Sequence, residues 1–97
     1  MSAYAYEEIV VEDTAKGLTG SYFDNALSLH MRDVRRIYLT VEEGALRFRV
    51  DGGEPGSSVG HELNEGDALD MDGTEGRRFR VIRSGTVSGK LRVTYEI

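Results

Sequence analysis

The residues best suited to chemistry lie between positions 51 and 76, where acidic side chains collect around one of the two histidines of the chain. This segment also contains Ser57, Ser58 and His61 but no lysine or arginine. Three kinds of site use such residues: a calcium site made of carboxylates, a transition-metal site centred on histidine, and a hydrolytic site with a serine nucleophile. The acidic residues of the segment are Asp51, Glu54, Glu62, Glu65, Asp67, Asp70, Asp72 and Glu75.

The calcium site has the closest sequence match, because residues 70–73 read Asp-Met-Asp-Gly, as in the middle of an EF-hand loop. The match fails where the first and last ligands of that loop should be, since Ala68 and Phe79 stand there. An irregular site formed by Asp67, Asp70 and Asp72 stays open, although a polar turn explains these residues as well. We therefore predict no bound metal.

The other two sites lack partners in the sequence. The chain has no cysteine, and its histidines, His30 and His61, stand alone, whereas a cupin-like metal site needs several converging ligands. The two serines lie near His61 in sequence, but a catalytic triad depends on a geometry that closeness within a loop does not supply. We predict no catalytic residue and no cofactor, and we expect that the protein is not an enzyme.

Length and composition indicate one small domain, which we predict to span residues 1–97. No apolar run approaches the roughly 20 residues that cross a bilayer, and the acidic N-terminus lacks the basic region of a signal peptide. We therefore expect no membrane association. A net charge of −5 argues against direct binding to nucleic acid.

Alternating apolar and polar residues predict an all-β fold, an antiparallel β-sandwich or jelly-roll-like barrel of about six to eight short strands. Residues 35–41 and 45–50 alternate most clearly, and only Glu42-Glu43-Gly44 separates them. A short turn between two such runs predicts a β-hairpin. Further strands are predicted at 8–12, 69–71, 78–82 and 90–97.

Two segments leave alternatives open. Residues 21–34 have apolar residues at helical spacing, and Ser21 with Asp24 resembles a capping box, so a short helix fits them. A crossover loop between strands fits them equally well. Residues 1–8 fit either an extended arm that adds to the sheet edge of a neighbouring copy or a frayed terminus.

The charges are distributed unevenly along the chain. Residues 77–97 carry six basic residues against Glu96 alone, so they complement the acidic segment. The two segments can pair within one chain or between copies, where complementary patches fix the register of an assembly. Arginine, which outnumbers lysine ten to two, suits carboxylate pairing at interfaces. The predicted interface residues are Tyr4, Tyr6, Arg47, Arg49, Arg78, Arg80, Arg92, Asp67, Asp70 and Asp72.

Residues 34–97 contain a series of strand and turn motifs whose order can be compared with that of known protein families. An alternating strand ends in Arg-Phe-Arg-Val-Asp-Gly, and Gly60-His61-Glu62-Leu63 and Gly66-Asp67 follow. The chain then continues with a strand-like run over residues 78–83 and closes on Leu91-Arg92-Val93-Thr94-Tyr95. This order resembles small β-sandwich virion proteins of tailed bacteriophages and prophages, of the kind that decorate capsids or serve as head and tail accessory parts.

The resemblance implies a non-enzymatic virion component, a capsid decoration or cement protein or a head–tail accessory protein. Such a protein would bind other copies of itself, as a trimer or ring, together with phage capsid or tail proteins, and its location would be the virion. The alternative is a carbohydrate- or ligand-binding β-sandwich module. In that case Tyr22, Phe23 and Tyr38 would be its aromatic platforms.

Overall fold

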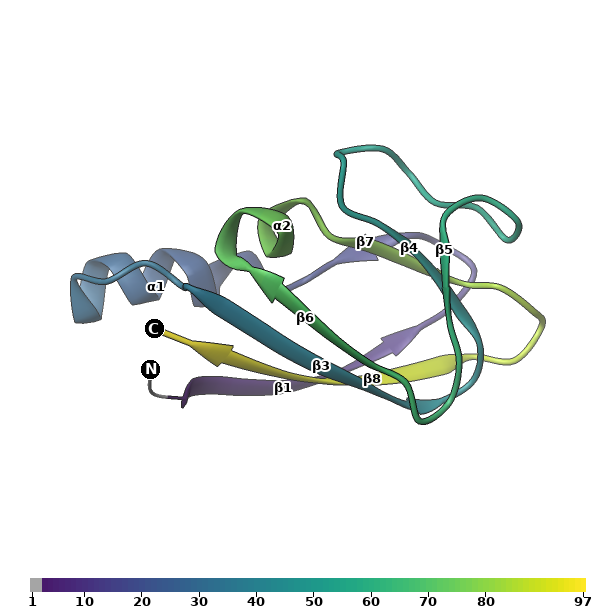
Figure 1. Cartoon of the computed structure of the whole chain (residues 1–97), viewed down its shortest axis with the longest axis horizontal. Coiled ribbons are helices and arrows are strands. Elements are labelled where there is room, and N and C mark those ends of the chain that lie inside the picture. Colours follow the sequence, from purple (N-terminus) through teal and green to yellow (C-terminus); the bar gives the residue numbers. More distant parts are fainter. Residues whose placement is uncertain (1–2) are drawn as a thin grey trace.

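The computed structural model describes residues 3–97 and is an all-β sandwich with two added helices (Figure 1). Sheet I has the strand order β1-β8-β3-β6, and sheet II has the order β2-β7-β4-β5. All neighbouring strands run antiparallel. The strands are β1 Ala3–Val11, β2 Lys16–Gly17, β3 Arg36–Glu43, β4 Leu46–Arg49, β5 His61–Leu63, β6 Ala68–Asp72, β7 Arg80–Arg83 and β8 Gly89–Glu96, and the helices are α1 Gly20–His30 and α2 Gly73–Arg78.

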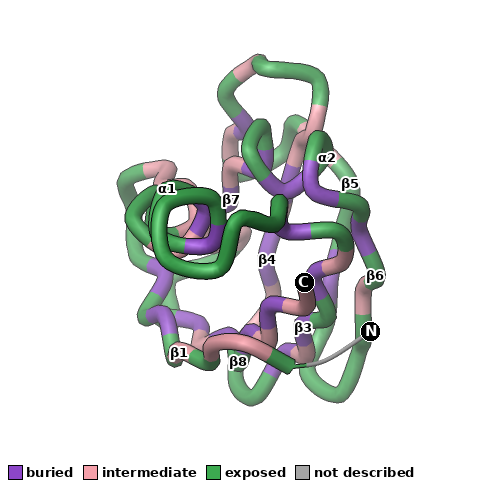
Figure 2. Tube along the Cα trace, turned by 90° about the vertical axis from the view of Figure 1, so that its left-hand side faces the viewer, coloured by how far each residue is buried: buried purple, intermediate pink, exposed green. Residues whose placement is uncertain are grey.

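The core lies between the two sheets because every second residue of the long strands is apolar and points inward. Figure 2 shows the buried segments turned toward the interior and the loops exposed around them. No charged side chain within residues 3–97 is fully buried. The inward residues of the two central strands of sheet I are Ile37, Leu39, Val41, Leu91, Val93 and Tyr95.

The predicted hairpin of residues 35–41 and 45–50 is wrong. β3 pairs with β8 and β6 in sheet I, whereas β4 pairs with β7 and β5 in sheet II. The chain crosses between the sheets at Gly44, whose φ of 81° favours glycine. Crossing lets both strands bury their apolar faces against the same core from opposite sides, which a hairpin within one sheet would not do.

Residues 21–34, which the sequence left open between helix and loop, contain most of α1. The helix begins at Gly20, with Thr19 as its N-cap residue, so Ser21 already lies inside the first turn and the predicted capping box of Ser21 and Asp24 is wrong. The Thr19 side chain makes no capping hydrogen bond. It ends where Met31 adopts the left-handed conformation with a φ of 54°. No helix formed by residues 3–97 is long and apolar enough to cross a membrane.

The second helix, α2, was not predicted, and its last residue, Arg78, takes the first position of the strand predicted over residues 78–82. Asp72 caps it by accepting a hydrogen bond from the Glu75 N–H, and the Glu75 side chain accepts one from the Asp72 N–H. The helix ends at Arg78, so β7 begins at Arg80 rather than at residue 78. The reciprocal cap explains the change, because it satisfies two N–H groups of the first turn.

Residues 3–11 form β1 at one edge of sheet I. The strand pairs with β8 from Ala3 opposite Glu96 to Val11 opposite Gly89. From residue 3 onward the segment considered as an extended arm therefore belongs to the sheet of its own chain. Met1 and Ser2 lie outside the described residues.

Candidate functional site

Two of the predicted interface arginines hold an acidic loop of their own chain against sheet II. The Arg49 Nη2 atom lies 2.6 Å from Asp51 Oδ2, and the Arg80 Nε atom lies 2.9 Å from Glu54 Oε1. Arg80 also donates to the Ala15 carbonyl at 3.1 Å. These contacts fold residues 51–60 back over the sheet that carries the arginines, where Figure 1 shows the loop beside β4 and β5. Here the acidic and basic segments pair within one chain.

The far end of the same loop is fixed by Arg47 and Gly60. The Arg47 Nη1 atom donates to the Gly60 carbonyl at 3.1 Å. Gly60 has a φ of 120°, and a Cβ atom there would lie 2.7 Å from the Phe48 carbonyl oxygen. A side chain at this position would therefore push the loop away from β4. Arg47 thus has a structural contact inside the chain, in addition to its predicted role at an interface.

The pairing of Asp51 predicts a titration at low pH. The hydrogen bond from Arg49, helped by the Gly53 N–H, lowers the pKa of Asp51 from 3.8 to about 2. Arg49 and the Gly53 N–H bind the charged carboxylate of Asp51. The contribution of this carboxylate to loop closure is therefore complete above pH 3.8 and is lost as the pH falls through about 2. An NMR titration of the Asp51 carboxyl carbon measures this midpoint. In Arg49→Gln the midpoint should rise toward 3.8, and an unchanged midpoint in that variant would contradict the assignment.

The outer face of sheet I is open and carries two exposed tyrosines. Tyr6 of β1 and Tyr38 of β3 each lie opposite Thr94 of β8, so they flank it in one row across the sheet. The Arg36 guanidinium lies 5.7 Å from the centroid of the Tyr38 ring. Of the predicted interface residues, Tyr6 is thus free to contact another molecule.

Charged residues surround these tyrosines in two groups. Arg36 lies 2.6 Å from Asp70 and 3.2 Å from Glu96. Arg92 lies between Glu8 and Glu42, at 3.7 and 3.4 Å. Exposed ion pairs of this kind contribute about 0–1 kcal/mol each, so they can be exchanged for a partner at small cost. Asp70 and Arg92 therefore combine an internal contact with an accessible position.

The remaining charged candidates lie apart from one another. Asp67 accepts a hydrogen bond from the Asn64 N–H at 2.7 Å in the turn before β6, and Asp72 caps α2. Arg78 is the last residue of α2 and is exposed. Asp67, Asp70 and Asp72 thus serve three separate contacts. Within residues 3–97 no three His, Asp or Glu side chains are grouped to hold a metal ion.

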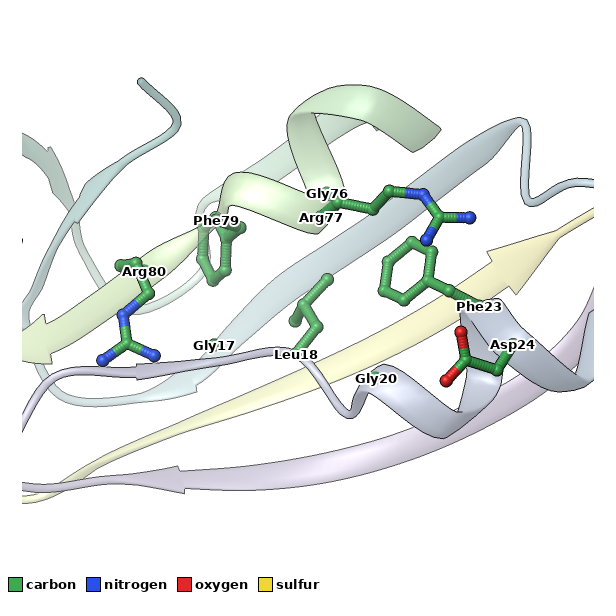
Figure 3. Close-up of a pocket in the computed structure, with 9 residues that line it drawn as sticks. All are labelled: Gly17, Leu18, Gly20, Phe23, Asp24, Gly76, Arg77, Phe79 and Arg80. Atoms are coloured by element: carbon green, nitrogen blue, oxygen red, sulfur yellow. The ribbon is translucent and has the colours of Figure 1, made fainter. Parts of the chain in front are cut away.

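A pocket of about 300 Å³ lies between α1, α2 and strands β2 and β7. Figure 3 shows Leu18, Phe23 and Phe79 turned toward one another along its floor. The Arg77 guanidinium stacks over the Phe23 ring at 4.8 Å from its centroid and pairs with Asp33 at 2.8 Å. These contacts give the pocket an apolar floor with a charged rim, which suits an apolar group that carries a charge beside it.

Gly20 and Asp24 form the mouth of this pocket on the α1 side. A Cβ atom at Gly20 would meet nothing within 4 Å, so the space in front of it is open. Asp24 makes no ion pair or side-chain hydrogen bond with any residue from 3 to 97. The mouth is therefore a place where an apolar group and a positive charge from another molecule would both find a partner.

Glu7 anchors the start of α1 to sheet I. It accepts hydrogen bonds from the Tyr95 hydroxyl, from the Thr19 hydroxyl at 2.6 Å and from the Thr19 N–H at 3.3 Å. Burial and the contact with Glu7 raise the pKa of Tyr95 above its ordinary value, so the phenol stays protonated as a donor. The position of α1, and with it the pocket mouth, thus depends on this residue.

Glu7→Ala should lower the free energy of unfolding by about 1–3 kcal/mol, because the buried Tyr95 hydroxyl loses its acceptor. Urea denaturation measures the change. The matched control is Glu8→Ala on the opposite face of the same strand, where the ion pairs with Lys90 and Arg92 are both 3.7 Å long. That variant should change stability by about 1 kcal/mol or less. Equal losses in both variants would show that Glu7 is no anchor.

Comparison of the chain with models of protein families, with curated proteins and with solved structures gave no significant match.

Sequence reasoning missed the pocket and its rim. The pocket forms where α1 and α2 meet, and α2 was hidden inside a segment whose acidic residues suggested a metal site. The spacing of Asp72 and Glu75 was the available signal, since an acidic residue followed three positions later by glutamate is typical of a helix start. The contact between the Arg77 guanidinium and the Phe23 ring joins residues far apart in the sequence, so no short sequence pattern could predict it.

Proposed function

We propose that this protein is a non-enzymatic structural component of a tailed-phage virion, a capsid decoration or cement protein or a head–tail accessory protein. The observation that carries the proposal is the strand order. The orders β1-β8-β3-β6 and β2-β7-β4-β5 correspond to the two sheets of a jelly roll. Jelly rolls are recurrent in viral capsid and lectin domains and in cupins. This support is an analogy at the level of the fold.

The distribution of polar groups agrees with a role in docking. The acidic loop and the arginines of sheet II are engaged with each other, and the exposed surface offers the tyrosines of sheet I and the mouth of the pocket. A protein that binds a symmetric lattice gains avidity from many weak contacts, so each contact need not be strong. The proposed partners are other copies of this chain, as a trimer or ring, and phage capsid or tail proteins.

Two measurements test the proposal. Light scattering across a wide range of concentration, at low and at high salt, should detect self-association, and contacts made by exposed charges should weaken at high salt. Sedimentation with capsids of a phage that encodes the protein, from which the native copies have been removed, should recover it with the particles. A protein that stays monomeric and binds neither capsids nor tails would refute the proposal.

A carbohydrate-binding module is the second candidate, and the tyrosine pair of sheet I favours it. Tyr6 and Tyr38 stand two strands apart, which places them about 10 Å from each other on an open face. Of the other proposed platforms, Tyr22 packs on Tyr95 and Phe23 is buried, so neither forms an open platform. A glycan array tests whether the protein is a carbohydrate-binding module. Binding to a glycan that is lost in Tyr38→Ala would favour this function.

A further inference from the structure

The pocket between α1, α2, β2 and β7 contains one charge that the protein itself does not compensate. The charged residues that line it are Asp24, Arg77 and Arg80. Arg77 pairs with Asp33 at 2.8 Å, and Arg80 donates to Glu54 at 2.9 and 3.3 Å. Asp24 has no such partner among residues 3–97. Figure 3 shows Asp24 at the α1 end of the pocket and Arg80 at the opposite end. The uncompensated carboxylate therefore favours a cation at the α1 end.

Beside this carboxylate the pocket has room for an apolar group. Its volume of about 300 Å³ is at the lower end of the range of small-molecule sites. A Cβ atom at Gly76 would overlap a side chain of β3, so the packing of α2 requires glycine there. At Gly20, in contrast, a Cβ atom would meet nothing within 4 Å. The space in front of Gly20 is therefore not needed for packing within the chain, and another molecule can occupy it.

The aromatic rings of the floor already have partners of their own. The Arg77 guanidinium lies 4.8 Å from the centroid of the Phe23 ring, and the Phe79 ring packs against Phe48 at 5.6 Å. A cation from another molecule therefore finds its partner in Asp24 rather than on the Phe23 ring. An ammonium ion suits this position, because it concentrates its charge in one compact group that a single carboxylate can hold.

We propose that this pocket binds an apolar group that carries an ammonium ion. The ammonium ion pairs with Asp24, and the apolar group lies over Leu18 and the edges of Phe23 and Phe79. An anion of the same shape would meet an uncompensated charge of its own sign. Two sources supply this chemistry, namely a free amine and the amino terminus of a polypeptide that begins with an apolar residue. The site goes beyond the proposed function, because it requires neither a second copy of the chain nor a lattice.

An NMR titration with phenethylammonium, an aromatic amine that is protonated at neutral pH, tests the proposal. The amine should shift the backbone amides of Gly17, Gly20 and Gly76, with a dissociation constant on the order of millimolar. Hydrocinnamate is the matched probe, since it joins the same ring through the same short chain to a carboxylate. It should bind at least about tenfold more weakly. Equal binding of the two ions, or shifts confined to residues outside the pocket, would overturn the proposal.

The variant Asp24→Asn tests the ion pair. It should weaken the binding of phenethylammonium by about fivefold to tenfold, because the hydrogen bonds to the ammonium ion lose the charge of their acceptor. Glu65→Gln is the matched control, since it removes one negative charge from an exposed turn outside the pocket and should leave the affinity unchanged. An equal loss in both variants would mean that the net charge of the protein, and not Asp24, attracts the amine.

Filling the mouth of the pocket tests where the apolar group lies. The side chain in Gly20→Leu should take up the open space and abolish detectable binding. Gly85→Leu is its control, because a Cβ atom there also meets nothing within 4 Å and Gly85 does not line the pocket. Circular dichroism should show the same fold for both variants. Binding that persists in Gly20→Leu would contradict the assignment of the apolar group to this pocket.

A peptide distinguishes the two sources of the ammonium ion. The amide of the tripeptide Phe-Gly-Gly carries the same ring and an ammonium ion at the end of a polypeptide. Binding at least as tight as that of phenethylammonium would identify the amino terminus of a partner, whereas loss of binding in the peptide alone would identify a free amine. If neither probe binds, the pocket assignment fails, and the tests of self-association and capsid binding still decide the proposed function.

Discussion

Phe79→Ala should lower the free energy of unfolding by about 3–5 kcal/mol, the usual loss for a buried aromatic side chain. Phe79 is fully buried, its ring centroid lies 5.6 Å from that of Phe48, and it forms part of the pocket floor. Its removal would join the pocket to the core of sheet II, and the neighbours could fill the space only in part. Since small domains are stable by about 5–15 kcal/mol, this is a large fraction of the total.

Urea and thermal denaturation measure this loss. The melting temperature should fall by at least about 12 °C, because each kcal/mol corresponds to roughly 4–8 °C in a domain of this size. Val87→Ala, at a residue that is 70% exposed, should change stability by no more than about 0.5 kcal/mol. Phe79→Leu should lie between the two. A loss below about 1 kcal/mol in Phe79→Ala would mean that the ring is not packed as the structure places it.

Gly73→Ala should destabilise the protein by about 3 kcal/mol, through steric overlap rather than through a cavity. Gly73 is buried at the first position of α2, and a Cβ atom there would overlap the carbonyl oxygen of Val34. A backbone atom cannot swing aside as the end of a side chain can, so α2 would have to move away from the segment before β3. The capping box of Asp72 and Glu75 would be strained by the same movement.

Denaturant unfolding checks this expectation, and Gly85→Ala is its control. A Cβ atom at Gly85 would meet nothing within 4 Å, so alanine should be neutral or slightly stabilising there. A second observable is the chemical shift of Arg77, because displacement of α2 would separate its guanidinium from the Phe23 ring. Equal stability of Gly73→Ala and Gly85→Ala would refute the close packing of α2.

The internal pairing of charges narrows the surfaces available for assembly. Arg49 and Arg80 are already engaged with Asp51 and Glu54, so a partner would have to displace that loop in order to reach them. The tyrosine face of sheet I requires no such displacement.

Local patterns in the sequence determined much of the fold. The alternation of apolar residues over 35–41, 45–50 and 90–97 depends only on the two-residue period of a strand, and the structure contains strands in each of these places. Composition alone also showed that no thiolate is available as a metal ligand or nucleophile and that only two imidazoles are present. The expectations for an assembly protein and its virion partners stay predictions.

Only the tertiary structure decided which sheet each strand joins. β1 and β8 pair although they lie at opposite ends of the chain, and β3 and β4 join different sheets although only Gly44 and Ala45 lie between them. Alternation tells which residues of a strand face the core, but not from which side of the core the strand faces it. Sheet membership, the Arg–carboxylate partners and the pocket between α1 and α2 all depend on contacts between distant residues, and no short stretch of sequence encodes such contacts.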